Sequence, residues 1–251
     1  MLARIMRRLL APALAIAVLS APAIGSAAAP IVWVQAGHAS PGEPGYSAQT
    51  GAGGGPFGSE IAFNVKVRDD MVTRLKAGGV DARPLVSKVM PMGASGATFI
   101  SIHFDSPGGG AGVGRAVVGG GENYYHGEGT GDASPTPYGD SGSHRVPATK
   151  VTAAVAANSA NLATRISSAL KGIHTPANGA SARFNGVEPP NGNVRMVHFY
   201  GYYRTKADAR VLVEVGAAGS DDPFLRKVPL IGSTLSTTIV KDLKARKLLP
   251  R

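Results

Sequence analysis

The chain has 251 residues, enough for one large domain or two small ones. It contains no cysteine, which excludes disulfides, thiol nucleophiles and cysteine-ligated zinc sites. Its 26 lysines and arginines against 16 aspartates and glutamates give a net charge of +10, which suits a polyanionic partner, although a soluble protein that is merely basic fits equally well.

The N-terminal 29 residues have the pattern of a secretory signal peptide. Basic residues come first, and an apolar stretch at residues 9–19 follows that is too short to span a bilayer. Small-residue cleavage sites lie at residues 21–23 and 26–28. We therefore expect residues 1–29 to be removed, with an uncleaved anchor as the alternative. Loss of Arg4, Arg7 and Arg8 would lower the net charge from +10 to +7.

Export has consequences for location and partners. It predicts a protein of the periplasm or the extracellular space, without stable membrane insertion after signal cleavage. It also disfavours nucleic acid as a partner. We expect a monomer, and residues 30–251 are expected to form a single domain.

Apolar runs and helical spacing predict the elements of that domain. Strands are expected at residues 31–35, 82–86, 97–104, 194–199 and 211–215. Helices are expected from Glu60 to Gly78, with Ser59 as N-cap, at 149–170 and at 229–248. This alternation predicts an α/β fold with a mostly parallel central sheet flanked by helices. The link at 88–96 is too short for a helical crossover, so the strands on either side are either antiparallel or not neighbours.

Residues 105–147 differ from the rest in composition. Glycine triplets and a Ser-Pro-Thr-Pro stretch predict a long loop, with short strands around 116–118 and 123–125. We expect this segment to be a mobile cover and not a separate domain.

Four residues carry the candidate chemistry: His38, Glu60, His103 and Glu214. Two imidazoles and a carboxylate make an open zinc site, with the fourth position left for water. A further carboxylate beside that water is what metal-assisted hydrolysis needs as general base. Three of the four follow or end apolar strands, and ligands bind at the carboxyl ends of strands in open α/β sheets. The alternatives are a strand-capping histidine, a helix-dipole carboxylate and, for Glu214, a structural salt bridge.

The order of these motifs resembles the zinc-dependent N-acetylmuramoyl-L-alanine amidases of the third amidase class. The motifs read Ala36-Gly37-His38, Ser59-Glu60, Ser101-Ile102-His103 and Glu214-Val215-Gly216. The resemblance implies that His38, Glu60 and His103 bind Zn²⁺ and that Glu214 is the catalytic carboxylate. It also implies a substrate, peptidoglycan, cleaved at the amide between N-acetylmuramic acid and L-alanine.

The chain departs from that family at positions that belong to the substrate groove. Asp105 stands where the family has asparagine, residues 85–87 lack its arginine, and Ser220-Asp221-Asp222 replaces a later motif. Two other functions therefore remain open: a catalytically weak wall-binding protein on the same fold, and a zinc amidase or peptidase with another substrate.

The other polar residues carry weaker signals. His126 in the long loop and His198 beside an aromatic stretch could border a substrate, but solvated and core positions are the simpler interpretations. His144 and His174 fall in polar loops. Asp221 and Glu128 are the next candidates for the catalytic carboxylate. The basic C-terminal residues are predicted to face solvent while Ile239, Leu243 and Leu248 pack inward; they are Lys241, Lys244, Arg246 and Lys247.

Overall fold

A computed structural model describes residues 28–38, 51–85, 94–118, 125–127, 145–147, 149–174, 183–187 and 205–250. Residues 1–27 of the expected signal peptide and the strand predicted at 194–199 lie outside these residues, as do His144 and His198.

The centre of the protein is a six-stranded sheet with the order β2-β1-β3-β8-β4-β7. Its strands are β1 (Ile31–Ala36), β2 (Asp81–Leu85), β3 (Thr98–Asp105), β4 (Gly110–Arg115), β7 (Arg183–Val187) and β8 (Arg210–Ala217). Neighbours from β2 to β8 pair in parallel, whereas β4 runs antiparallel to β8 and parallel to β7. The predicted α/β fold with a mostly parallel sheet is confirmed. Strand β1 lies between β2 and β3, so the short link at 88–96 joins strands that are not neighbours.

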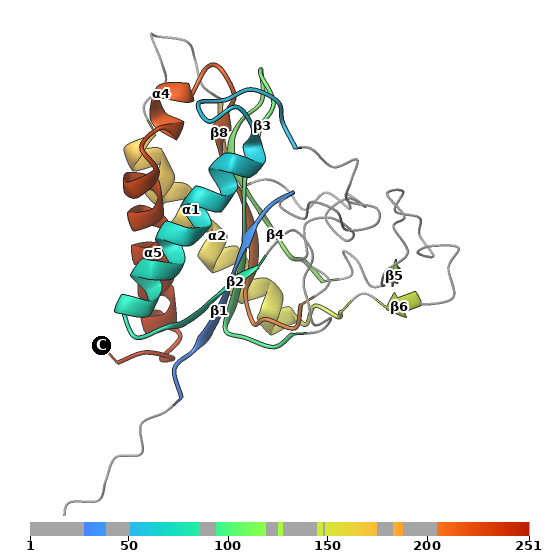
Figure 1. Cartoon of the computed structure of the whole chain (residues 1–251). Helices are drawn as coiled ribbons and strands as arrows, with labels where there is room; N and C mark the ends of the chain where they lie inside the picture. The colour runs from blue at the N-terminus through green and yellow to red at the C-terminus, as the bar shows by residue number, and fades with distance from the viewer. Residues whose placement is uncertain are drawn as a thin grey trace, which may run out of the picture.

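Three long helices cover one face of the sheet (Figure 1). They are α1 (Glu60–Ala77), α2 (Ala153–Ile173) and α5 (Val228–Ala245), and the short α4 (Asp222–Leu225) follows β8. Alternate strand residues such as Val34, Ile102 and Val213 form one buried cluster with these helices. None of the described helices combines the length and apolar character needed to cross a bilayer.

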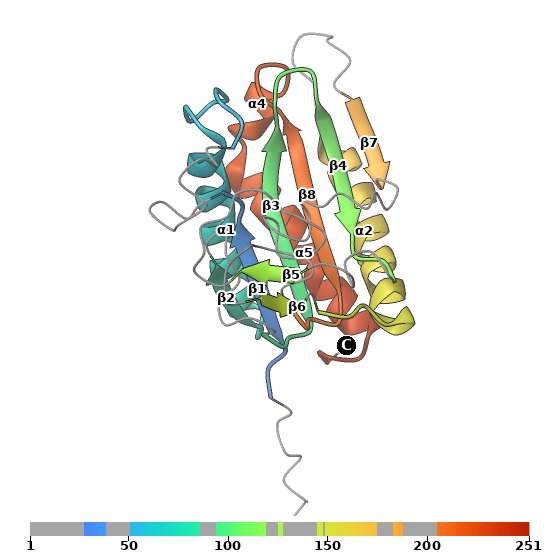
Figure 2. The same cartoon turned by 90° about the vertical axis from the view of Figure 1, so that its right-hand side faces the viewer.

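The opposite face of the sheet carries a smaller core and the site residues. Trp33, Phe99 and Leu212 belong to this second cluster. A two-stranded ribbon of β5 (Tyr125–Gly127) and β6 (Arg145–Pro147) lies on this side, as Figure 2 shows. The strand residues therefore alternate between a helix-covered core and a face that is free to carry polar groups.

The first helix begins and ends as its sequence predicts. The Ser59 hydroxyl accepts a hydrogen bond from Ala62 N at 3.2 Å, and Glu60 stands in the first turn, where the helix dipole favours a carboxylate. Gly78 and Gly79 end the helix, and Gly79 has the left-handed φ of +79° that a glycine adopts readily. This start places Glu60 at the carboxyl edge of the sheet.

The prediction of one continuous loop over residues 105–147 is wrong in part. Strand β4 occupies Gly110–Arg115 and pairs with β8 inside the sheet. Short strands were expected at 116–118, where the described chain has none, and at 123–125, of which only Tyr125 is described. The sequence of this strand, Gly-Ala-Gly-Val-Gly-Arg, alternates glycine with a larger residue. This period of two indicates a β-strand, but the high glycine content concealed it.

The C-terminal helix also differs from its prediction in detail. Arg246 is half-buried and donates hydrogen bonds to Asp242 Oδ2, Ala97 O and Thr98 Oγ1 at 2.7–2.8 Å. It therefore ties α5 to β3 and is not a free surface cation. Leu248 is 40% exposed, although it was expected to pack inward.

Candidate metal centre

Three of the predicted site residues meet at the carboxyl edge of the sheet. His38 follows β1, Glu60 opens α1 and His103 lies near the end of β3. Each offers one ligand atom, and these atoms all lie within 4.8 Å of one another. The strands are adjacent and parallel, so their carboxyl ends converge where the helix begins.

One oxygen, Oε1 of Glu60, lies close to both imidazoles. It is 2.9 Å from His103 Nδ1 and 3.6 Å from His38 Nε2. The two imidazoles meet edge to face, with ring centroids 4.9 Å apart. Zinc bonds of about 2.0–2.1 Å in a tetrahedron would separate its ligand atoms by about 3.3 Å. The observed distances lie on either side of that value.

His38 is held in an unusual backbone conformation. Its φ is +59°, in the left-handed region that few non-glycine residues occupy. Such strain persists only where surrounding contacts fix it, and it concentrates at functional sites. The conformation ends β1 and directs the chain away while the imidazole remains beside Glu60.

The Glu60 side chain is buried and fully surrounded by donors. Its exposed fraction is 3%. Oε2 accepts a hydrogen bond from Ala52 N at 2.6 Å, and Oε1 accepts one from Phe104 N at 3.3 Å. Burial alone would raise the pKa of Glu60, but the hydrogen bond from His103 and attraction to both imidazoles outweigh it. The pKa is thus held below its ordinary value of 4.5, and the carboxylate is ionised and able to bind a cation.

His103 is oriented from two sides. While Nδ1 faces Glu60, Nε2 lies 2.8 Å from Ser101 Oγ. Such a bond on the second ring nitrogen is the usual support of a metal-binding imidazole. A Cβ built on Gly37 would overlap the His103 ring, so the ring requires a glycine there.

These features fit zinc. Two neutral imidazoles and one carboxylate are a common donor set for a zinc centre with an open fourth position. The role of the three residues as zinc ligands remains a prediction.

Glu214 lies beside this cluster on the next strand. The β3–β8 register pairs His103 with Glu214, so both side chains leave the same face of the sheet, on strands about 4.8 Å apart. Its other neighbour in register is Gly112 of β4, which has no side chain. Glu214 is half-buried. A carboxylate in this position is suitably placed to act on a water near His103.

Of the two alternative candidates for the catalytic carboxylate, Asp221 makes contacts away from the His-Glu-His cluster. Asp221 is fully buried, and its Oδ2 accepts a hydrogen bond from Ala217 N at 2.8 Å. Its Oδ1 lies 3.3 Å from Nε2 of His174, which caps the end of α2 and was expected in a polar loop. Asp105 accepts backbone hydrogen bonds from Ser106 and Gly110 at the turn into β4. Glu128 and the His126 side chain lie outside the described part of the chain.

Sequence reasoning missed the residues that support the ligands. They are Gly37, Asn64 and Ser101. Asn64 follows Glu60 by one helical turn and Ser101 precedes His103 by two strand positions, so each lies on the same face as a predicted ligand. That spacing is a signal the sequence contained.

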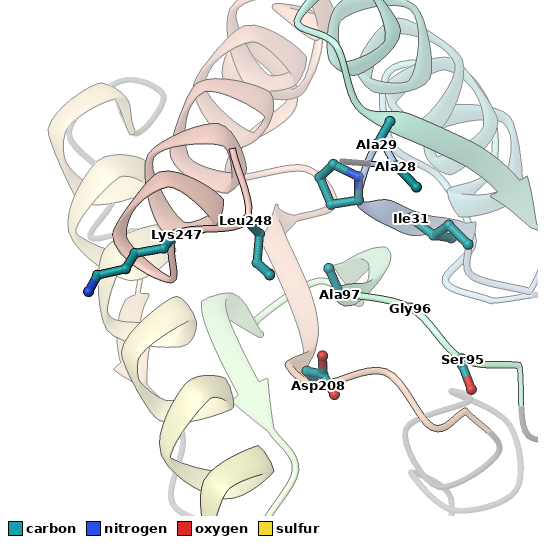
Figure 3. A pocket seen from close by; sticks show the side chains of 10 residues that line it. Ala28, Ala29, Ile31, Ser95, Gly96, Ala97, Asp208, Lys247 and Leu248 are labelled. Carbon is teal, nitrogen blue, oxygen red and sulfur yellow. The ribbon is translucent and has the colours of Figure 1, made fainter. Parts of the chain in front are cut away.

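A cavity of about 400 Å³ lies at the other end of the sheet (Figure 3). Ile31, Ala97 and Asp208 line it, and these residues stand at or before the amino ends of β1, β3 and β8. It is therefore remote from the His-Glu-His cluster.

Comparison with known proteins places the fold. No protein-family model and no curated protein sequence matches the chain. Among solved structures, the N-acetylmuramyl-L-alanine amidase Ami1 from Mycobacterium smegmatis is 17% identical, with a TM-score of 0.53 over 88% of this chain and 100% of its own. Cwp6 from Clostridium difficile is 14% identical, with a TM-score of 0.51 over 87% of this chain. This chain spans only 30% of Cwp6.

The fold and the site together define an α/β protein with a potential metal centre at the carboxyl edge of its sheet. The fold is shared with a solved N-acetylmuramoyl-L-alanine amidase. The resemblance expected from the four motifs is thus confirmed at the level of the fold.

Proposed function

We propose that this protein is an exported zinc-dependent amidase that hydrolyses the bond between N-acetylmuramic acid and L-alanine in peptidoglycan. The observation that carries the proposal is the convergence of His38, Glu60 and His103 beside Glu214. The shared fold with Ami1, whose name describes this activity, supports the choice of substrate.

His38, Glu60 and His103 would hold the zinc ion. Bound there, zinc would acidify a water molecule and polarise the scissile carbonyl. Three protein ligands would leave a fourth position for water, and Glu214 stands next to His103 on the same face.

Glu214 would serve first as base and then as acid. Its carboxylate accepts the proton of the attacking water, and the protonated side chain then delivers that proton to the nitrogen of L-alanine. The amide C–N bond breaks, and the products are the lactyl carboxylate of muramic acid and the free amine of the stem peptide.

The test combines metal content with release of soluble stem peptides from purified cell-wall sacculi. The wild-type protein should contain one zinc and release peptides. His103→Ala should lose zinc and activity together. Glu214→Gln should keep zinc and fold but lose about 10²–10⁴-fold in turnover.

A matched control is Asp208→Asn, an acid-to-amide change at an exposed position beyond the other end of the sheet, which should leave turnover unchanged. Zinc retained in His103→Ala would contradict the ligand assignment. Zinc and sacculus binding without peptide release would favour the wall-binding alternative, and cleavage of other amides alone would favour a different substrate.

Export, a monomeric state and the absence of a nucleic-acid partner belong to the same proposal. The N-terminus of the protein recovered from the cell envelope should begin near residue 30.

A further inference from the structure

Asn64 is a fully buried polar residue of α1, with an exposed fraction of 0%. Asparagine is mostly exposed in proteins, and a buried amide without hydrogen bonds is costly. Asn64 stands four residues after Glu60, so both side chains lie on one face of the helix.

Its amide nitrogen makes two hydrogen bonds that join different parts of the metal centre. Nδ2 donates to Gly37 O at 2.9 Å and to Glu60 Oε1 at 3.3 Å. Both acceptors are oxygens, one of them ionised, so the opposite amide orientation would set oxygen against oxygen. The contacts therefore fix which end of the amide faces the site.

The first of these bonds controls the backbone that carries His38. Gly37 N donates to Ile102 O of β3 at 3.0 Å, while Gly37 O accepts from Asn64. Both polar groups of Gly37 are thus held, one by the sheet and one by the helix. His38 follows directly, in its left-handed conformation.

The second bond acts on the ligand oxygen itself. Glu60 Oε1 lies close to both imidazoles, and Asn64 donates a hydrogen bond to it from the helix side. A leucine of similar size would fill the same volume, but it could donate to neither oxygen. Packing alone does not account for an amide at this position.

We propose that Asn64 is a positioning residue that sets Glu60 and His38 in the geometry required for metal binding. This inference rests on the proposed zinc function. Hydrogen-bond partners of metal ligands typically contribute about 10–100-fold to metal affinity. The side chain acts through Glu60 and through the carbonyl that precedes His38.

The experiment measures the zinc affinity of the purified protein by competition with a chromophoric chelator at fixed pH. Circular dichroism and thermal unfolding of the zinc-free protein are recorded alongside. Asn64→Leu should bind zinc about 10–100-fold more weakly than wild type. Asn64→Ser, whose hydroxyl donates only one hydrogen bond, should fall between the two.

The matched control is Met71→Ala, also fully buried on α1 and about 10 Å further along the helix axis. It should lower the thermal stability of the zinc-free protein while changing zinc affinity less than about twofold, as expected for independent sites. This separates a positioning role from a merely structural one.

Equal zinc affinity in wild type, Asn64→Ser and Asn64→Leu would overturn the inference while leaving the proposed function intact. If Asn64→Leu does not fold, the zinc affinities of Asn64→Ser and Met71→Ala are compared instead. A lower affinity in Asn64→Ser than in Met71→Ala is then the expected result, and equal affinities would overturn the inference. A wild-type protein that binds no zinc would overturn both.

Discussion

Gly37 provides a sharp test of the site geometry, because replacing it with alanine adds one methyl group directly against a proposed zinc ligand. A Cβ at this position would overlap the His103 imidazole. Gly37 does not have a positive φ, so an alanine at this position introduces no backbone strain. The destabilising effect of the substitution is therefore steric.

The magnitude follows from two opposing terms. Alanine in place of glycine at an unstrained position stabilises by about 0.4–1 kcal/mol through the unfolded chain. Overpacking of a buried site costs about 1–3 kcal/mol. The middle of the two ranges gives a net destabilisation of about 1.3 kcal/mol, or a fall in Tm of about 3–5 °C for a domain of this size.

Zinc affinity should fall more steeply than stability. A displaced ring loses its alignment with Glu60 and with Ser101, so an affinity loss of at least about tenfold is expected. The assays are thermal unfolding without zinc and chelator competition with it. The control is Gly53→Ala, where an added Cβ meets nothing within 4 Å and φ is not positive. If the two alanine variants unfold and bind zinc alike, the inferred contact between Gly37 and His103 is wrong.

Two further predictions concern protons and salt. The pKa of Glu60 is lower in the folded protein than its ordinary value of 4.5, so the unfolded chain takes up the proton first as the pH falls. The contribution of Glu60 to the stability of the zinc-free protein is therefore complete above pH 4.5 and is lost as the pH falls from there through the lowered pKa. In Glu60→Gln, the free energy of unfolding should depend less on pH in that window. Parallel pH dependences in the variant and the wild type would contradict the assignment. Lys241, Lys244 and Lys247 are exposed on the last helix and its end, so they can contact an anionic wall. Sacculus binding should weaken as the Debye length falls from about 10 Å at 0.1 M salt to about 3 Å at 1 M. If replacement of all three lysines by glutamine leaves binding at low salt unchanged, these lysines have no role in wall binding.

The cluster of His38, Glu60 and His103 could be predicted because its members belong to elements with strong local signals. A continuous apolar run marks β1 and β3, and Ser59 with Glu60 marks the start of α1. Once two strands are expected to be parallel, their carboxyl ends must lie at one edge. The position of each residue relative to its own element was therefore sufficient to bring His38, Glu60 and His103 together.

The part of the fold that sequence reasoning missed depends on contacts between distant segments. In β4, glycine content outweighed the alternation that the sequence contains, and the pairing with β8 identifies the strand. The contact of His174 with Asp221 joins the end of α2 to the turn after β8 and leaves no local pattern. Arg246 is different, because its partner Asp242 lies one helical turn earlier and that spacing was visible in the sequence.

The position of Glu214 shows how apolar residues can determine where a polar side chain lies. Val213 and Val215, on either side of it, are fully buried in the core beneath the helices. Because side chains alternate along a strand, this burial forces Glu214 onto the other face, where His103 is its partner in register. A shift of β8 by one residue would bury the carboxylate and expose both valines, so the register is strongly specified. The hydrophobic pattern of β8 thus places the proposed base beside the metal centre, although neither valine belongs to the site.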